Sequence, residues 1–172
     1  MKQNNLIDLI NEDVCFQTKD LRRFRLRAAG IIIENDHVLF ATNDSENYYY
    51  SIGGAVNLGE SMEHAVCREV FEETGIHYEI DRLAFIQENF FKRNDGMLKG
   101  LTCHEITFYF LMKSRGTQNL NSHSITQGLT EQMCWLPIDK LNSYEAYPKF
   151  FAEKLPALKP YPEHIVTYQL ST

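Results

Sequence analysis

Hydrophobic and polar residues alternate along the chain after residue 21. Arg23, Arg25 and Arg27 would lie on one face of an extended strand, with apolar residues between them on the other face. An apolar run at residues 30–33, a turn-like Glu-Asn-Asp and a second apolar run at 37–41 follow. This order of apolar runs around a turn predicts a β-hairpin.

A helix is predicted next, at residues 61–74. Ser61 is a typical N-cap residue, Glu63 carries a negative charge in the positively polarised first turn, and Gly75 is typical of the left-handed position that ends a helix. A shorter helix is predicted at 147–154, and a polar loop at 114–127. The remaining strand-like runs are at residues 48–52, 83–91, 101–112, 133–136 and 164–170. Strands interleaved with helices predict a mixed α/β or α+β fold.

Composition narrows the class of protein. A chain of 172 residues without an internal repeat or a linker-like segment predicts a single domain, spanning residues 1–172. The formal net charge of −6 disfavours binding to duplex nucleic acid, which depends on neutralising phosphates, but permits a small anionic ligand escorted by a metal. The sequence contains no membrane-length apolar run and no signal-peptide pattern, and its four cysteines are widely spaced. We therefore expect reduced thiols, a cytoplasmic location and no membrane partner.

Three glutamates of the predicted long helix point to a chemical function. Glu69, Glu72 and Glu73 fall within about 100° of one helix face, and Val66 and Val70 lie on a different arc that would be buried. Like charges at this spacing destabilise a helix by a few tenths of a kcal/mol each, so something should offset the repulsion. A hard divalent cation with oxygen ligands would do so. The alternative is a solvated acidic face.

The residues around these glutamates match a known pattern. Gly54 is followed after five residues by Glu60, and after seven more by the run REVFEETGI, which begins at Arg68. This arrangement, from Gly54 to Ile76, resembles the Nudix box of the Nudix hydrolase superfamily, with every specified position filled. The hairpin before the box and the Trp-Leu-Pro sequence at 135–137 also resemble the family. The resemblance places the core at about residues 22–141, with extensions of the same domain at 1–20 and 142–172.

The resemblance implies a Nudix-like α/β/α sandwich with a mixed β-sheet, in which the box forms a loop–helix–loop. It also implies hydrolysis of a nucleoside diphosphate linked to another group, with Mg²⁺ or Mn²⁺. By analogy, Arg68 orients the catalytic glutamates and Glu60 fixes the loop. In some members the counterpart of Glu69 also acts as general base, whereas in others a later loop supplies the base. The metal ligands implied by the analogy are Glu69, Glu72, Glu73 and the carbonyl oxygen of Gly54.

Other residues are weaker candidates for the site. Glu105 lies in an otherwise apolar strand, where a carboxylate costs free energy unless it is paired or bound, so it is a candidate metal ligand; an outward-facing strand position is the alternative. Glu131 is a second, weaker candidate, with an exposed loop residue as the alternative. For the substrate, Arg25 and Arg27 could bind phosphate or form an exposed cationic face. Gly53 could bring backbone close to a ligand, and Phe90 could stack on a base.

The sequence therefore predicts a metal-dependent pyrophosphohydrolase that acts on a small nucleotide. The alternative is a catalytically silent Nudix-fold nucleotide sensor or interaction domain, against which the intact set of acidic residues argues. The sequence leaves open the nucleotide that is cleaved and whether the protein is a monomer or a homodimer.

Overall fold

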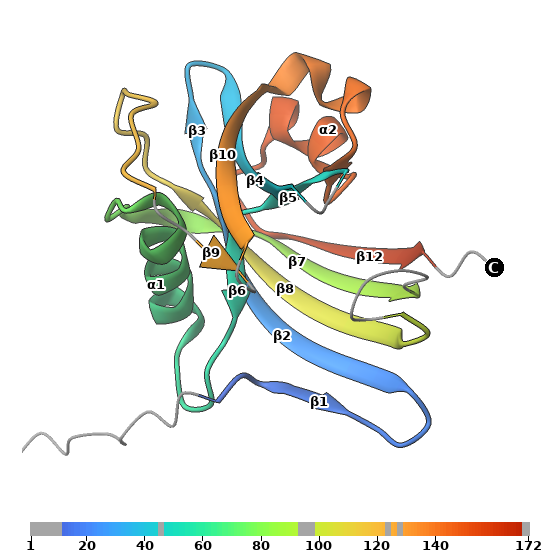
Figure 1. Cartoon of the computed structure of the whole chain (residues 1–172). Coiled ribbons are helices and arrows are strands. Elements are labelled where there is room, and N and C mark those ends of the chain that lie inside the picture. Colours follow the sequence, from blue (N-terminus) through green and yellow to red (C-terminus); the bar gives the residue numbers. More distant parts are fainter. Residues whose placement is uncertain (1–11, 45–46, 93–98, 123–124, 127–128, 170–172) are drawn as a thin grey trace, which may run out of the picture.

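Two mixed β-sheets lie at the centre of the computed structural model, which describes residues 12–44, 47–92, 99–122, 125–126 and 129–169 (Figure 1). The first sheet has the strand order β1-β2-β8-β7-β12, with β6 paired to β2. Its strands pair antiparallel except for β2 with β8 and β7 with β12, which run parallel. The bounds are β1 (Cys15–Gln17), β2 (Arg22–Ile31), β6 (Gly53–Ala55), β7 (Ile80–Lys92), β8 (Thr102–Met112) and β12 (Glu163–Gln169).

The second sheet has the order β11-β5-β4-β10-β9, with β3 paired to β4. Only β11 and β5 run parallel among its described pairs. The bounds are β3 (Ile33–Glu34), β4 (His37–Asn43), β5 (Tyr49–Ser51), β9 (Ile125–Thr126), β10 (Leu129–Pro137) and β11 (Ala146–Tyr147).

Helices cover the sheets from opposite sides (Figure 1). Helix α1 (Met62–Thr74) packs Val66 and Val70 into one hydrophobic core, together with Ala28 of β2. Helix α2 (Phe151–Lys154) packs Phe151 into a second core, together with Ala29 of β2. Neighbouring strand residues point to opposite faces, which is why Ala28 and Ala29 contribute to different cores. The 3₁₀ helices Ile138–Ser143 and Leu155–Ala157 accompany α2.

The predicted mixed fold and its sandwich of helices around sheet are confirmed, with the sheet layer divided into two sheets. The hairpin turn is made by Asn35 and Asp36, whose φ angles of 50° and 61° are typical of a two-residue turn between twisted strands. The predicted helix at 147–154 was too long at its start. Tyr147 pairs with Tyr50 in the second sheet, so the helix begins only at Phe151.

The described part of the chain contains no helix that is both long and apolar enough to cross a membrane. All four cysteines are free thiols, and of these only Cys103 is fully buried.

Candidate active site

Helix α1 presents the acidic residues toward the start of β6. Ser61 caps the helix by accepting a hydrogen bond at Oγ from the backbone N–H of His64 (3.2 Å), and Gly75, with a φ of 69°, ends it. Val70 and Thr74 are fully buried against the sheet, whereas Glu72 lies outside. The local signals in the sequence therefore place this helix and its rotation correctly.

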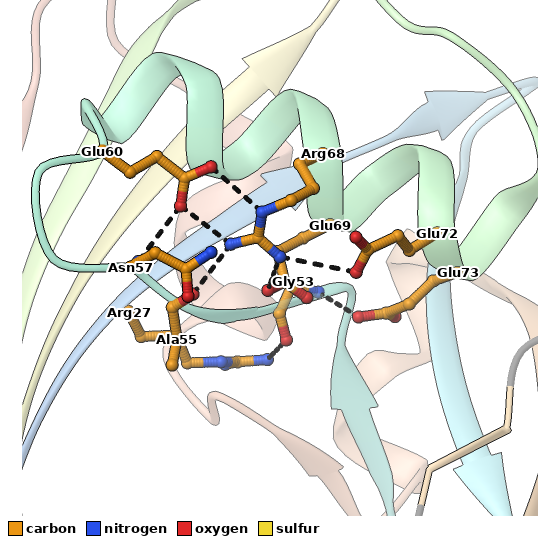
Figure 2. Close-up of polar contacts among 9 residues, drawn as sticks. All are labelled: Arg27, Gly53, Ala55, Asn57, Glu60, Arg68, Glu69, Glu72 and Glu73. Carbon is orange, nitrogen blue, oxygen red and sulfur yellow. Dashed lines mark hydrogen bonds and ion pairs between the residues drawn. The ribbon is translucent and has the colours of Figure 1, made fainter. Parts of the chain in front are cut away.

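Arg68 is the centre of the polar contacts in Figure 2. Its Nε and Nη2 donate to the two carboxylate oxygens of Glu60 (3.0 and 2.9 Å), and Nη2 also donates to the carbonyl oxygen of Ala55 (3.0 Å). Nη1 donates to Glu69 Oε1 (2.6 Å) and lies 3.4 Å from Glu72 Oε2. One guanidinium thus connects the loop before the helix, strand β6 and two of the three predicted metal ligands.

Glu60 fastens the loop that precedes the helix. Besides its two bonds from Arg68, its Oε2 accepts the backbone N–H of Asn57 (3.1 Å). Partial burial on its own would raise the pKa of the Glu60 carboxyl, but the hydrogen bonds from Arg68 and Asn57 outweigh it, and the pKa lies below its usual value. The carboxylate is therefore held in its charged form.

Two glycines of β6 form the surface that the glutamates approach. The backbone N–H of Gly53 donates to Glu73 Oε1 (2.8 Å). A Cβ on Gly54 would lie 2.3 Å from Glu69 Oε2, so only glycine leaves room for that carboxylate. The strand predicted at residues 48–52 is found as β5, which ends at Ser51, and Gly53 and Gly54 begin a separate strand, β6, which pairs with β2. The absence of side chains permits both this pairing and the approach of the acids.

Arg27 supports this surface from below. Its guanidinium donates to Ser51 Oγ (3.0 Å) and to the carbonyl oxygens of Ser51 and Gly53 (both 2.7 Å). These contacts hold the chain between β5 and β6, so most of the Arg27 donors are used within the protein.

Burial changes the proton affinity of the acids. Glu73 is 9% exposed, and burial raises the pKa of its carboxyl well above the usual value; the charges of Glu131 and Glu69 add to the rise, and the Gly53 N–H and Arg27 oppose it. Burial likewise raises the pKa of Glu69, against the lowering effect of Arg68. Glu73 Oε2 is buried and has no hydrogen-bond partner among the described residues.

Glu131 lies in strand β10 and is 7% exposed, so the alternative of an exposed loop residue was wrong. Its Oε1 accepts a hydrogen bond from the Tyr50 hydroxyl (2.6 Å). Burial and this bond raise the pKa of Tyr50. Because the charge of Glu131 also acts on Glu73, the structure brings this residue to the edge of the acidic group.

Glu105 lines a small open hollow on the face of the first sheet that carries Arg27. Its side chain is 15% exposed, against the alternative of an outward-facing strand position, and its Oε2 is 3.6 Å from Arg25 Nη1. This ion pair engages one nitrogen of Arg25, whose Nε is buried without a hydrogen-bond partner among the described residues. Phe90 lies on the opposite face of the sheet, where its ring stacks on His104, and does not belong to the hollow. Tyr50 and Tyr109 also line the hollow. The lining residues that the sequence did not single out include Ser51, Gln87, Asn89, Tyr147 and Gln169.

For two of these residues, Gln87 and Asn89, the sequence contained a signal: they are polar residues at alternate positions of an otherwise apolar strand. Gln87 is 4% exposed and bonded to Thr167 Oγ1 (2.9 Å), and Asn89 follows two residues later on the same face. Their burial depends on β12, which is distant in the sequence: Gln87 and Thr167 are 80 residues apart.

Among the described residues, no three His, Cys, Asp or Glu side chains are arranged to hold a metal ion together. Arg68 explains this arrangement, because its guanidinium is ion-paired with the Glu69 carboxylate and lies close to that of Glu72. The donor set nevertheless fits a hard cation. Glu73 Oε2 is a buried oxygen without a partner, and Glu69, with a pKa raised by burial, lies beside it.

A family model for the NUDIX domain matches residues 24–158. The chain belongs to the Nudix family. It is similar to a MutT-like protein of Streptomyces ambofaciens, with 39% identity over 62 residues, 36% of this chain and 40% of that protein. It is also similar to an RNA pyrophosphohydrolase of Blochmanniella pennsylvanica, with 39% identity over 57 residues, 31% of this chain and 36% of that protein. The matched stretches thus span less than half of either relative.

The Nudix fold is also found in a crystal structure of a MutT protein from Bacillus halodurans. That structure matches with a TM-score of 0.65 and 17% sequence identity, covering 85% of this chain and 90% of the other. At this identity the likeness concerns the fold alone.

The two glycines of β6 should respond differently to alanine. Gly53→Ala should lower the free energy of unfolding by about 1–3 kcal/mol, because the φ of 135° is strained for a side chain and the new Cβ would lie 2.4 Å from the Ala28 carbonyl oxygen. Gly54→Ala meets only the flexible end of Glu69, so it should fold normally. Urea unfolding of both variants measures the contrast, and equal losses would contradict it.

Proposed function

We propose that this Nudix protein is a hydrolase that cleaves the diphosphate of a nucleoside diphosphate joined to another group, with Mg²⁺ or Mn²⁺. Membership of the family supports the proposal, as does the similarity to a protein named RNA pyrophosphohydrolase. The four free thiols suit a reducing compartment, so we also propose a cytoplasmic location.

One observation carries the proposal. Buried carboxylates gather over the two glycines of β6, and one of their oxygens, Glu73 Oε2, has no partner among the described residues. Burying a charged carboxylate with one oxygen left without a partner costs free energy, and a bound cation would offset that cost. The ligands we propose are Glu69, Glu72, Glu73 and the carbonyl oxygen of Gly54.

A bound divalent cation neutralises diphosphate oxygens and lowers the pKa of a water molecule. The protein residues then have three tasks. Arg68 and Glu60 fix the loop and the orientation of Glu69, and a carboxylate of the acidic group accepts the proton of the attacking water. Little covalent chemistry is required beyond this positioning and charge neutralisation.

The hollow beside the acidic group provides the place for the rest of the substrate. Arg27, Glu105 and Asn89 line it together with tyrosines, so both charged and aromatic contacts are available. We propose that it holds the nucleoside or the leaving group. Glu105 and Glu131 remain proposals as further metal ligands.

The test is the release of nucleoside monophosphate from a panel of substrates with Mg²⁺ or Mn²⁺. The panel contains ADP-ribose, nucleotide sugars, dinucleoside polyphosphates, NADH, coenzyme A and oxidised nucleoside triphosphates. We expect one class to be cleaved well and chelation by EDTA to stop the reaction. No turnover of any member, with tight binding of one, would favour the catalytically silent sensor instead.

Thermal stability should rise with added Mg²⁺ if the acidic group is a cation site. A ligand at ten times its dissociation constant stabilises the native state by about 1.4 kcal/mol, which is a shift of roughly 3–6 °C for a chain of this size. Differential scanning fluorimetry with and without EDTA measures the shift, and Na⁺ at equal ionic strength is the control. An equal shift in both salts would contradict a specific site.

A further inference from the structure

Five aromatic rings form a continuous row across the first sheet, one on each of five neighbouring strands. In the order of the strands they pair directly: Phe16 with Phe24, Phe24 with His104, His104 with Phe90, and Phe90 with Tyr168. Their ring centroids are 5.4, 5.3, 4.3 and 5.1 Å apart, and three of the four contacts are stacked. We call these residues the aromatic row.

The aromatic row is separate from the candidate active site. Strand alternation places it on the face opposite Arg25 and Gln87, and thus opposite the hollow. It continues the face that α1 covers, at the end of the sheet that extends away from the helix (Figure 1). The five rings lie beyond the part of the sheet that α1 covers and are not part of the hydrophobic core beneath that helix.

The row ends in open rings on both sides. Phe16 lies on β1 and Tyr168 on β12, the two edge strands of the sheet, and they are 59% and 70% exposed. Among the described strands, neither edge strand has a further strand beside it, so the outer side of each terminal ring has no neighbour from the described part of the sheet. Val166, two residues before Tyr168 on the same face, is 44% exposed as well.

A basic border follows the aromatic row. Arg22 and Lys92 lie two residues beyond Phe24 and Phe90 on the same strands, so they are on the same face, and both pair with Thr102 between them. At this end of the sheet, five of the six described charged side chains are basic, in a protein of net charge −6. The five are Lys19, Arg22, Arg23, Lys92 and Lys99, and the sixth is Asp20.

One carboxylate lies behind the row, and it is paired. Glu88 Oε1 is 2.8 Å from His164 Nε2, and Glu88 Oε2 is 3.7 Å from His104 Nε2. Its charge is therefore directed toward two imidazoles rather than toward the basic border.

We propose that the aromatic row and its basic border bind single-stranded nucleic acid. Bases stack on the open rings of Tyr168 and Phe16, and phosphates lie along Lys92 and the nitrogens of Arg22 that its exposed ion pair with Asp20 (Nε to Oδ2, 2.9 Å) leaves available. Stacking and a positive border are the two features by which proteins hold single strands without reading their sequence. A duplex does not fit, because its bases are already stacked on one another and are not available to the open rings.

The test uses a twelve-nucleotide RNA and a DNA of the same sequence, each with a 5′-hydroxyl and a 3′-fluorescein, so that neither carries a pyrophosphate. Fluorescence anisotropy at low salt measures binding to the full chain. We expect Tyr168→Ala to weaken binding roughly 5- to 150-fold, the usual effect of removing one stacking ring, and Tyr168→Phe to retain it. Tyr161→Ala is the matched control, since Tyr161 is 60% exposed and lies outside the row.

The salt dependence of binding tests the basic border separately. Lys92→Ala should reduce the slope of log affinity against log salt by about 0.7, and Lys140→Ala should not. Because Tyr168 and Lys92 are exposed and distant from the acidic group, cleavage of the panel substrate should be unchanged in both variants. A difference between the RNA and the DNA identifies the preferred strand, and either one binding through Tyr168 supports the proposal.

Three results would overturn it. The first is the absence of binding at low salt, and the second is binding that Tyr168→Ala leaves unchanged. The third is a dimer, seen by light scattering, that Tyr168→Ala dissociates, because the row would then be an interface between two copies of this chain. Circular dichroism of each variant shows that the fold is intact.

Discussion

Glu72→Gln is expected to reduce turnover about a hundredfold or more while leaving the fold unchanged. The substitution removes one charged oxygen ligand from the proposed cation site, and electrostatic contributions of this kind are usually the largest in such reactions. The Glu72 side chain is 56% exposed and makes one long contact to Arg68, so the protein loses little when it changes. Initial rates with the best substrate of the panel, at saturating Mg²⁺, measure the effect.

Glu63→Gln is the matched control for this experiment. Glu63 lies on the same helix, is exposed, and is not among the residues that Arg68 contacts in the described part of the chain. The control should retain full activity, and the Mg²⁺-dependent thermal shift should persist in it but shrink in Glu72→Gln. Near-normal turnover of Glu72→Gln would remove this residue from the proposed ligands, whatever the thermal shift shows.

Arg68→Ala should have the second large effect, on both stability and activity. The Glu60 side chain is 6% exposed and would lose the two hydrogen bonds from its guanidinium partner. Removing one partner of a buried pair leaves an uncompensated charge, so we expect a loss of about 3 kcal/mol in the free energy of unfolding at neutral pH. Arg68→Lys should recover only part of it, because an ammonium cannot make the two-pronged contact.

The pH dependence separates this effect from a general loosening of the fold. In the native protein the pKa of Glu60 is lower than its usual 4.5, so its contribution to stability is complete above that pH and is lost as the pH falls through the lower folded value. In Arg68→Ala, burial without the partner should raise that pKa. The destabilisation should therefore be largest at pH 7 and shrink by pH 4.

Urea unfolding of both proteins at the two pH values measures the difference. Arg22→Ala serves as control, because its ion pair with Asp20 is exposed and should matter little at either pH. A destabilisation by Arg68→Ala that stays constant between pH 7 and pH 4 would contradict the role given to Glu60.

Local chemistry made much of the site predictable. The caps at Ser61 and Gly75, the buried arc of α1 and the spacing of the glutamates all depend on residues within one helix. The predicted strands were also found, although with shifted ends, because the alternation of side chains along a strand is a local property. The roles of the strand residues were less predictable, as Phe90 shows, since the face on which a side chain lies depends on where its strand is placed.

The sequence by itself therefore determined the family, the fold class and the helix that carries the acids, because these depend on periodicity and spacing over about twenty residues. Only the tertiary structure decided that Glu131 is buried under the Tyr50 hydroxyl, that Arg25 is paired with Glu105, and that Gly53 begins a strand. It also assembled the aromatic row from five strands. The physical reason is that strand register decides which distant residues become neighbours. Tyr50 of β5 and Glu131 of β10 meet because both strands pair with β4 through backbone hydrogen bonds, and no local pattern of side chains specifies that pairing.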